Sequence, residues 1–592
     1  MSSNNRRPSM AERRSSVTQE SGGTHPQRRP SVVPHLAGLE KPIPESIPDQ
    51  FDVVIAGTGL AESVLAAALA WQGTNVLHID ANSYYGDSTA TLTIDQLKQW
   101  VQNVNSNKVQ GYKDALLYIP SGNELSARDF GIDLTPNILF CKSDLLSLLI
   151  KSRVYKYLEF QPLSSFHFYE NDNFEKMTST KQDIFTNQTL SLVTKRSLMK
   201  FIKFALDWEA HPEIWEPYKK KSIETFLSEH FKLEKTQIFE LIFSIGLCNN
   251  NEIQTPEALL RIKRYLVSFD VYGNFPVMYS KYGGAGEISQ GFCRSAAVAG
   301  TTYKLNTRLV SFDPKTKIAQ LSDDSKIHVN EQIIISPSQA PTGSKFKPKQ
   351  QYQIQRLTAV VKKECTQWFQ DGESAAIVVF PTGSLDSNNK HAVQAIIMGD
   401  GTGITAKGTC VWYMSTIETG DQGRKDLEAA LQNMENSILR ESSDLDTQDF
   451  LDDTHTGALN SVKLGQSFRD FVPKEKIQYL LKFYYVQMTS IPHAGVVVPE
   501  QYRKNSTYVE EDVDAPDRGV IYSSLPSSEI SYDGVITAAK VLYEKIVGSD
   551  DDFFDVDFED DEDDSSISAA NLDSAIADSG AGPVEFADDM EL

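Results

Sequence analysis

One segment, Phe51–Asp80, constrains the fold of this chain more than any other, because it has the layout of a dinucleotide-binding βαβ unit. Its turn reads Gly57-Thr58-Gly59, and Asp80 ends the second β run at the spacing at which such units bind a ribose hydroxyl. The segment therefore predicts an α/β fold with a Rossmann-like parallel sheet. The expected elements are a strand over Phe51–Ala56, a helix over Ala61–Trp71 and a strand over Val76–Ile79.

Glu62 stands where the third glycine of that fingerprint would be. In a working site this glycine lets helix and strand pack closely, and the helix N-terminal amides hold a pyrophosphate. A carboxylate in the first turn would act as a fixed anion and repel a bound phosphate. We therefore expect Gly57, Gly59, Glu62 and Asp80 to form a vestigial motif, and we expect no FAD or NAD cofactor.

The chain of 592 residues is long enough for about three or four domains. No apolar run approaches the ~20 residues of a membrane span, and the N-terminus has no apolar signal region, so a cytoplasmic protein is expected. The five scattered cysteines predict buried reduced thiols and no zinc site. No Ser/His/Asp set, paired carboxylates or metal-spaced histidines appear, which indicates no catalytic or metal site.

The net charge of −23 is concentrated at the C-terminus. From Ile546 onward there are seventeen acidic residues and no Lys or Arg, so the rest of the chain carries −23 less −17, or −6. Such a run is typical of a solvated disordered tail, or of a docking element for a basic partner, which Phe553, Phe554 and Phe558 favour. It argues against nucleic-acid binding, because phosphate contacts need Lys and Arg.

The first 50 residues are rich in Ser, Pro and Arg and predict a disordered arm. Arg-Arg-x-Ser occurs in them three times, which resembles the consensus of basophilic protein kinases. One hypothesis is that Ser9, Ser16 and Ser31 are phosphorylated, each adding about −1.5 to −2 charge. The alternative is a chance spacing of arginine and serine.

Helical periodicity dominates the middle of the chain, where Leu198–Ala205, Ile238–Ile245 and Leu259–Phe269 each repeat apolar residues at helical spacing. A run of helices inside an α/β chain predicts an inserted all-helical domain. A helix that is apolar all round is usually buried core, but a bundle that opens could admit a lipid. The expected organisation is an arm at 1–50, an α/β domain at 51–185 and 271–547, a helical domain at 186–270, and an acidic disordered tail at 548–592.

Several motifs together resemble the superfamily of Rab GDP-dissociation inhibitors and Rab escort proteins, a flavoenzyme-like fold without flavin. The resemblance covers nearly all of Phe51–Val547. Its most specific pieces are Gly57-Thr58-Gly59-Leu60-x-Glu62, Val76–Asp80 followed by Tyr84-Tyr85-Gly86, Asp133-Leu134, Tyr282-Gly283 through Gly286-Glu287, and Gln290-Gly291-Phe292-x-Arg294.

The escort branch is the closer resemblance, because the chain is longer than the inhibitors in its middle and at its C-terminus. The segments that look like those of escort proteins are Leu148–Ser152, Asp183–Phe185, Thr194–Phe201 and Gly291–Arg294. The resemblance implies no bond chemistry by this chain. It implies that GDP-bound Rab GTPases are presented to the heterodimeric Rab geranylgeranyltransferase, that geranylgeranyl groups are shielded, and that prenylated Rab reaches membranes through a transient contact.

The resemblance also implies roles for particular residues. A Rab-binding platform would comprise Tyr84, Tyr85, Glu287, Arg294, Thr302 and Lys304. The helical domain would bind the prenyl chains or the transferase through Phe201, Ile202, Ile238, Leu241, Ile242 and Tyr265, with Tyr265 as a candidate transferase anchor and helix packing as its alternative.

Three departures from the family pattern put loop geometry in question. Asp87 replaces the second glycine of Tyr-Tyr-Gly-Gly, Gly284-Ala285 lengthens one segment, and Ser336-Pro337-Ser338 stands where inhibitors have Asp-Pro-Ser. Two rival functions remain open. One is a GDP-dissociation inhibitor that extracts and recycles prenylated Rab, and the other is a flavin-dependent oxidoreductase.

Overall fold

The computed structural model describes residues 48–120, 125–126, 129–170, 172–177, 190–341, 352–451, 476–489 and 519–556. Ser9, Ser16 and Ser31 lie outside these residues, and so do the segment Asp183–Phe185 and most of the acidic tail. Within the described part of the chain, no helix is long and apolar enough to cross a membrane.

The βαβ unit expected at Phe51–Asp80 is present. Strand β1 (Gln50–Ala56) pairs in parallel with β2 (Val76–Ile79), and α2 (Leu60–Trp71) connects them. Both strands belong to a seven-stranded sheet with the order β11-β2-β1-β14-β13-β12, in which β20 also pairs with β14. The remaining strands are β11 (Thr302–Lys304), β12 (Leu309–Asp313), β13 (Ile318–Leu321), β14 (Lys326–Ile335) and β20 (Val520–Tyr522).

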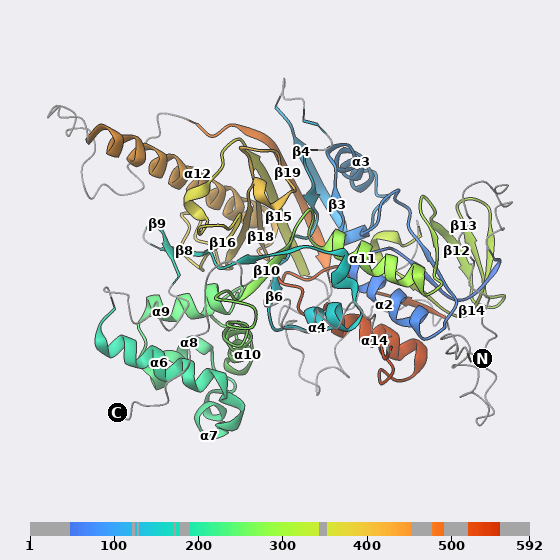
Figure 1. Ribbon diagram of the computed structural model, residues 1–592, viewed down its shortest axis with the longest axis horizontal. Coiled ribbons are helices and arrows are strands. Elements are labelled where there is room, and N and C mark those ends of the chain that lie inside the picture. The colour runs from blue at the N-terminus through green and yellow to red at the C-terminus, as the bar shows by residue number, and fades with distance from the viewer. Residues whose placement is uncertain are drawn as a thin grey trace, which may run out of the picture. The chain divides into compact units, whose positions relative to one another are not determined.

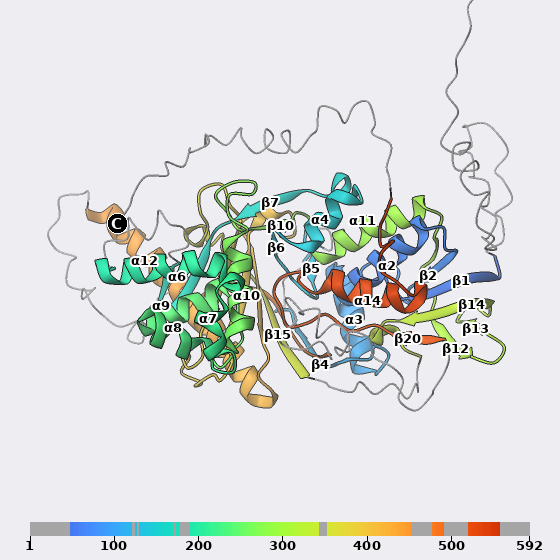
Figure 2. The same ribbon diagram turned by 90° about the horizontal axis from the view of Figure 1, so that it is seen from below.

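Three helices pack together against this sheet: α2, α11 (Ala285–Val298) and α14 (Val535–Val547) (Figures 1 and 2). Alanines fill the middle of α2, and their small side chains allow the close approach of α11. At that contact the Ser63 hydroxyl lies 3.2 Å from the Cys293 sulfur. All five cysteines are buried and free, as the sequence predicts.

A second, eight-stranded sheet has the order β4-β19-β15-β18-β17-β16-β8-β9. Its two faces are covered by different elements. Ile377 and Val379 of β16 pack into the cluster that includes the middle helices, whereas Val378 and Phe380 pack with residues of α12 (Gly420–Leu451). The strands are β4 (Tyr112–Tyr118), β8 (Phe166–Glu170), β9 (Asn173–Lys176), β15 (Tyr352–Val361), β16 (Ala375–Phe380), β17 (Val393–Met398), β18 (Cys410–Thr416) and β19 (Tyr479–Thr489).

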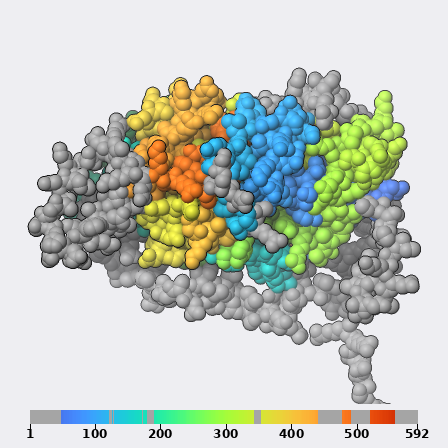
Figure 3. Space-filling view, turned by 90° about the horizontal axis from the view of Figure 1, so that it is seen from above, coloured from blue at the N-terminus to red at the C-terminus, as the bar shows by residue number. Residues whose placement is uncertain are grey.

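Shorter elements join the two sheets. Strand β4 pairs with β19, and the blue residues of β4 and α3 (Ile94–Asn105) lie beside the orange of β19 in Figure 3. A capping box between Thr93 and Gln96 begins α3. Two small sheets pair β3 (Thr91–Leu92) with β5 (Ile132–Asp133), and β10 (Val277–Ser280) with β6 (Leu139–Phe140) and β7 (Phe160–Leu163). Helix α4 (Asp144–Lys151) and the 3-10 turn η2 (Val154–Tyr157) lie between β6 and β7.

The middle of the chain is helical, as its periodicity predicts. It forms α6 (Leu192–Leu206), α7 (Pro212–Trp215), α8 (Ile223–Phe231), α9 (Lys235–Phe239) and α10 (Thr255–Leu266). The helix expected over Ile238–Ile245 is mostly a π-helix and not an α-helix, because α9 continues as the π-helix η5 (Glu240–Ile245). Its residues are buried on both faces, as expected of a helix that is apolar all round.

The acidic tail starts later than expected. Phe553 and Phe554 are buried among α11 and α14, so residues up to Val556 pack on the folded body. The sequence predicts that the tail begins at residue 548, because an acidic composition is a stronger signal of disorder than two aromatic residues are of packing. Burial of these two rings explains why the first residues of an acidic run can be held in place.

Candidate functional site

The glycine turn after β1 is closed by packing against other parts of the chain. Gly57 has a φ of +111°, and a Cβ atom there would lie 2.6 Å from the Cβ of Ser336, so only glycine fits. His78, buried in β2, has its Nε2 atom 2.6 Å from the carbonyl oxygen of Gly57. Burial lowers the pKa of His78 to about 4, which identifies it as a packing residue of the turn.

The side chain of Glu62 fills the space in front of this turn. A Cβ atom at Gly59 would lie 2.5 Å from Oε2 of Glu62, and Oε1 accepts a hydrogen bond from the hydroxyl of Ser523. Burial raises the pKa of Glu62 to about 7. Burial thus disfavours the negative charge that we expect at this carboxyl group. Its main obstacle to a phosphate is the space that it occupies.

The groups that would hold a dinucleotide already have partners within the chain. The amide of Leu60 donates to Thr89 Oγ1 at 3.2 Å, and the amide of Thr58 donates to Asp80 Oδ2 at 2.9 Å. The other oxygen of Asp80 accepts from the backbone amide and the side-chain amide of Asn82, at 2.8 and 2.9 Å. The carboxylate of Asp80, at the position that binds a ribose in a working site, is thus buried, and both of its oxygens already accept hydrogen bonds. These residues do not fit a flavin or nicotinamide dinucleotide.

A small pocket remains beside Glu62, with a volume of about 60 Å³. The first turns of α2 and α14 line it, together with Glu529 and Asp533. A water molecule needs roughly 10–15 Å³ by this measure, so the pocket has room for only a few waters.

Asp87, one of the departures from the family pattern, is buried on the other side of the turn. Its carboxylate accepts hydrogen bonds from Ser336 Oγ at 2.7 Å and from Gln339 Nε2 at 2.7 Å, and Ser338 donates to the same carboxylate. Its backbone has a φ of 40°, in the region that favours glycine. Asp87 and Asp80 are close enough that the charge of Asp87 adds to burial in raising the pKa of Asp80.

The candidate platform residues lie on the loop after β2, on β11 and on α11. Tyr85 is half-buried, and its ring meets the ring of Tyr303 edge-on at 5.7 Å. Thr302 and Lys304 flank Tyr303 on β11, and Lys304 forms an ion pair with Asp323. Tyr84 differs from Tyr85 because it packs against the large hydrophobic cluster, whereas burial raises the pKa of both tyrosines.

Two further platform candidates lie two turns apart on α11. Glu287 is half-buried, and its pKa is raised by burial and by the nearby charge of Asp133. Arg294 is exposed, and its guanidinium lies 4.4 Å from the ring centre of Tyr157. Sequence reasoning missed Tyr157 and Tyr303. The one signal for Tyr303 is that side chains alternate along a strand, which places Tyr303 on the opposite face of β11 from Thr302 and Lys304.

The candidates in the helical region are all buried. Tyr265 has no exposed surface, and its ring packs edge-on against Phe166 at 5.5 Å and Phe269 at 5.2 Å. Helix packing, the alternative for Tyr265, describes its position in this structure, and the transferase anchor stays a prediction. The other buried candidates, which share one hydrophobic cluster with the eight-stranded sheet, are Phe201, Ile202, Ile238, Leu241 and Ile242.

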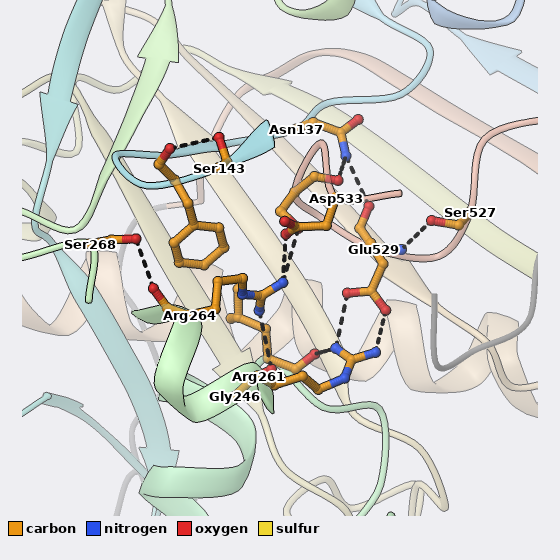
Figure 4. Close-up of polar contacts among 12 residues, drawn as sticks. Asn137, Ser143, Gly246, Arg261, Arg264, Ser268, Ser527, Glu529 and Asp533 are labelled. Atoms are coloured by element: carbon orange, nitrogen blue, oxygen red, sulfur yellow. Dashed lines mark hydrogen bonds and ion pairs between the residues drawn. The ribbon is translucent and has the colours of Figure 1, made fainter. Parts of the chain in front are cut away.

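Two buried arginines of α10 join the helical region to the loop between β20 and α14 (Figure 4). Arg261 donates to both carboxylate oxygens of Glu529, at 3.0 Å from Nη1 and 2.5 Å from Nη2. One turn on, Arg264 donates to Asp533 at 2.6 Å, and its guanidinium lies 4.2 Å from the ring centre of Phe140. No sequence pattern indicates these pairs, because their members are 268 and 269 positions apart.

Among the described residues, no group of three or more His, Cys, Asp or Glu side chains is arranged to hold a metal ion. The geometry instead shows a closed glycine turn, and buried ion pairs that tie the helical region to the loop between β20 and α14.

Comparison with known proteins agrees with this geometry. Residues 47–488 match the family model described as GDP dissociation inhibitor. The chain is 58% identical, over the whole of both chains, to "Rab proteins geranylgeranyltransferase component A" of Saccharomyces cerevisiae, and 50% identical over 87% of both chains to the protein of that name from Candida albicans. A solved structure, a Rab GDI from Plasmodium falciparum, is 21% identical with a TM-score of 0.58 and covers 85% of this chain and 99% of its own, which supports the fold. The chain therefore belongs to the GDP dissociation inhibitor family, and within it to the escort branch.

Proposed function

We propose that this protein is a Rab escort protein, which binds newly made GDP-bound Rab GTPases and presents them for prenylation of their C-terminal cysteines. The observation that carries the proposal is the 58% identity, over both full chains, to the yeast protein named as component A of the Rab geranylgeranyltransferase. Its partners would be the Rab and the catalytic α/β heterodimer of the transferase.

The closed glycine turn supports a non-catalytic role. Glu62 occupies the space in front of the turn, and Asp80 is held by Thr58 and Asn82. We propose that the protein carries no flavin and that the Rossmann-like sheet serves as a scaffold. The metal that activates the Rab thiolate would belong to the transferase.

The Rab would bind to the surface formed by Tyr85, Glu287 and Arg294, with Thr302 and Lys304 at its edge. An aromatic ring, a carboxyl group and a guanidinium supply contacts whose strength depends on orientation. Selection of the GDP form would follow because GTP rearranges the switch loops that such a surface contacts.

The helical region would shield the prenyl chains after the reaction and contact the transferase. Its candidate side chains are buried against one another, so binding a chain requires the helices α6–α10 to separate. Each geranylgeranyl group carries of order 10 kcal/mol of transfer free energy, at about 0.8 kcal/mol per buried CH₂. Shielding of this size would let the protein work in the cytoplasm and touch a membrane only on delivery.

The test is prenylation of an unprenylated, GDP-loaded Rab by purified catalytic heterodimer, with and without this protein. We expect strong stimulation by the full chain. Absence of stimulation, together with extraction of prenylated Rab from vesicles, would favour the GDP-dissociation inhibitor instead. Visible flavin absorbance of the purified protein would contradict the proposed lack of cofactor and revive the oxidoreductase.

A further inference from the structure

Phe553 and Phe554 fix the point at which the acidic tail leaves the folded body. The ring of Phe553 meets Tyr543 of α14 at 5.3 Å, and the ring of Phe554 meets Phe292 of α11 at 6.1 Å. At the end of α2, Gln72 Nε2 donates to the carbonyl oxygen of Asp552 at 2.8 Å. The acidic residues after Val556 therefore start from a defined position on the helical layer.

Carboxylates on either side of this anchor already pair with lysines of neighbouring helices. Asp550 lies 3.8 Å from Lys540 of α14, and Asp555 lies 3.9 Å from Lys151 in the last turn of α4. Both pairs are partly exposed, so each contributes little to stability. The two pairs show where the start of the tail runs, because Asp555 lies at the C-terminal end of α4.

Positive charge continues from that point toward α11. Turn η2 contacts both α4 and α11, and the guanidinium of Arg294 lies over Tyr157, the last residue of η2. The exposed side chains of Ile150 and Tyr157 add apolar surface between these charges. We call this surface the basic strip, and its charged members are Lys151, Arg153, Lys156 and Arg294.

We propose that residues Asp557–Asp564 of the tail bind to the basic strip of the same molecule. This segment has seven acidic residues among its eight, and the eighth is Phe558, which matches a strip of positive charge with exposed Ile150 and Tyr157. Eight extended residues reach up to about 27 Å. The strip begins at the residue that Asp555 already contacts, so the segment needs no long connection to reach it.

Binding of the tail would cover Arg294, which the proposed function places in the Rab-binding platform. A Rab would then have to displace the acidic segment, and the tail would act as a built-in competitor that weakens Rab binding at low salt. This consequence rests on the proposed function, whereas the intramolecular contact itself does not. Screening by salt weakens contacts between exposed charges, so the competition should fade as ionic strength rises.

Zero-length carbodiimide crosslinking of the full-length protein tests the contact directly. We expect mass spectrometry to find amide links that join Lys151 and Lys156 to acidic residues within Asp557–Asp564. Mixing light and heavy isotope-labelled protein shows whether both ends come from one molecule. Links that are absent, that join two different molecules, or that connect the segment to other lysines would overturn the proposal.

Matched tail variants test the consequence for Rab binding. In one, every Asp→Asn and Glu→Gln change is made within Asp557–Asp564. In the control, the six acidic residues of the last twenty positions are neutralised in the same way, and Phe553 and Phe554 are kept in both. We expect the first variant to bind GDP-loaded Rab about 3- to 10-fold more tightly at low salt, and the control to bind like the parent.

The crosslinking experiment tests the intramolecular contact, and the Rab-binding measurements test its consequence for the proposed function. Equal Rab affinity of the parent and the first variant would overturn the competition. If no form of the protein binds Rab, the proposed function fails, and the crosslinks alone then decide whether the acidic segment occupies the basic strip.

Discussion

The carboxylate of Asp87 accepts a hydrogen bond from the hydroxyl of Ser336 at 2.7 Å, although 249 positions separate the two residues. Both residues depart from the pattern that the resemblance implies, in which glycine stands at the first position and, in the inhibitors, aspartate at the second. We therefore expect the two departures to compensate each other, with the acidic group moved from one side of this contact to the other.

The first prediction follows from this exchange. Asp87→Gly alone should lower the melting temperature, because it leaves the hydroxyls of Ser336 and Ser338 without their acceptor, at a cost of about 1–3 kcal/mol. Ser336→Asp alone should also lower it, because the new carboxylate would face that of Asp87. In the double variant the two losses should largely cancel, and additive losses would show that the sites are independent.

The second prediction concerns Glu62 and pH. Burial raises its pKa from 4.5 to about 7, so the folded protein binds this proton more tightly than the unfolded chain does. The stability that this group contributes is full below about pH 4.5 and is lost as the pH rises through about 7. Glu62→Gln should abolish that loss and gain up to about 3 kcal/mol above pH 7, with little change near pH 4.

Melting temperatures measured between pH 4 and pH 9 check this dependence. The exposed Glu544→Gln of α14 serves as the control and should follow the parent at every pH. Asp80 remains in all three proteins, and its raised pKa leaves some of the slope in each. A Glu62→Gln curve parallel to that of the parent would mean that Glu62 is not the buried titrating group.

The βαβ unit could be predicted from the sequence because its strands, turn and helix are set by neighbouring residues. The observed α2 begins at Leu60, one residue before the prediction. Contacts between distant residues could not be predicted in this way. Nothing local indicates that Arg261 finds Glu529, that Tyr265 is enclosed, or that Phe553 and Phe554 pack on α11 and α14. The candidate site is also only partly predictable from the sequence, because the Tyr84-Tyr85-Gly86 motif indicates Tyr85, whereas no motif indicates its neighbour Tyr303.

The third prediction tests the platform. Arg294→Ala should weaken binding of GDP-loaded Rab by about 10- to 100-fold, as expected when a central arginine of an interface is lost. Fluorescence titration at fixed salt measures this, and prenylation at limiting Rab should fall in parallel. Arg424→Ala on α12 is the control, because Arg424 is also exposed and, like Arg294, lies over a tyrosine ring, at 5.4 Å from the ring centre of Tyr484, besides its i,i+4 pair with Glu428. Equal losses in both variants would indicate a general effect of charge.

The fourth prediction compares two cations of the same helix. Arg261 and Glu529 are each only 2% exposed, whereas Lys263 and Glu209 form a 2.6 Å pair that is 29% and 48% exposed. Arg261→Met should cost about 3–5 kcal/mol, because it leaves the carboxylate of Glu529 buried and unpaired. Lys263→Met should cost less than about 1 kcal/mol, since water can solvate the glutamate that remains.

The double variant Arg261→Met/Glu529→Met separates the charge from the shape of this contact. Removing both charges removes the unpaired carboxylate, so the double variant should be nearer to the parent in melting temperature than Arg261→Met is. If the double variant also stimulates prenylation of Rab by the transferase normally, then packing alone positions α10 against the loop between β20 and α14. If its stability recovers but stimulation of the transferase does not, the buried ion pair sets the orientation of the helical region, and that orientation is what the transferase requires.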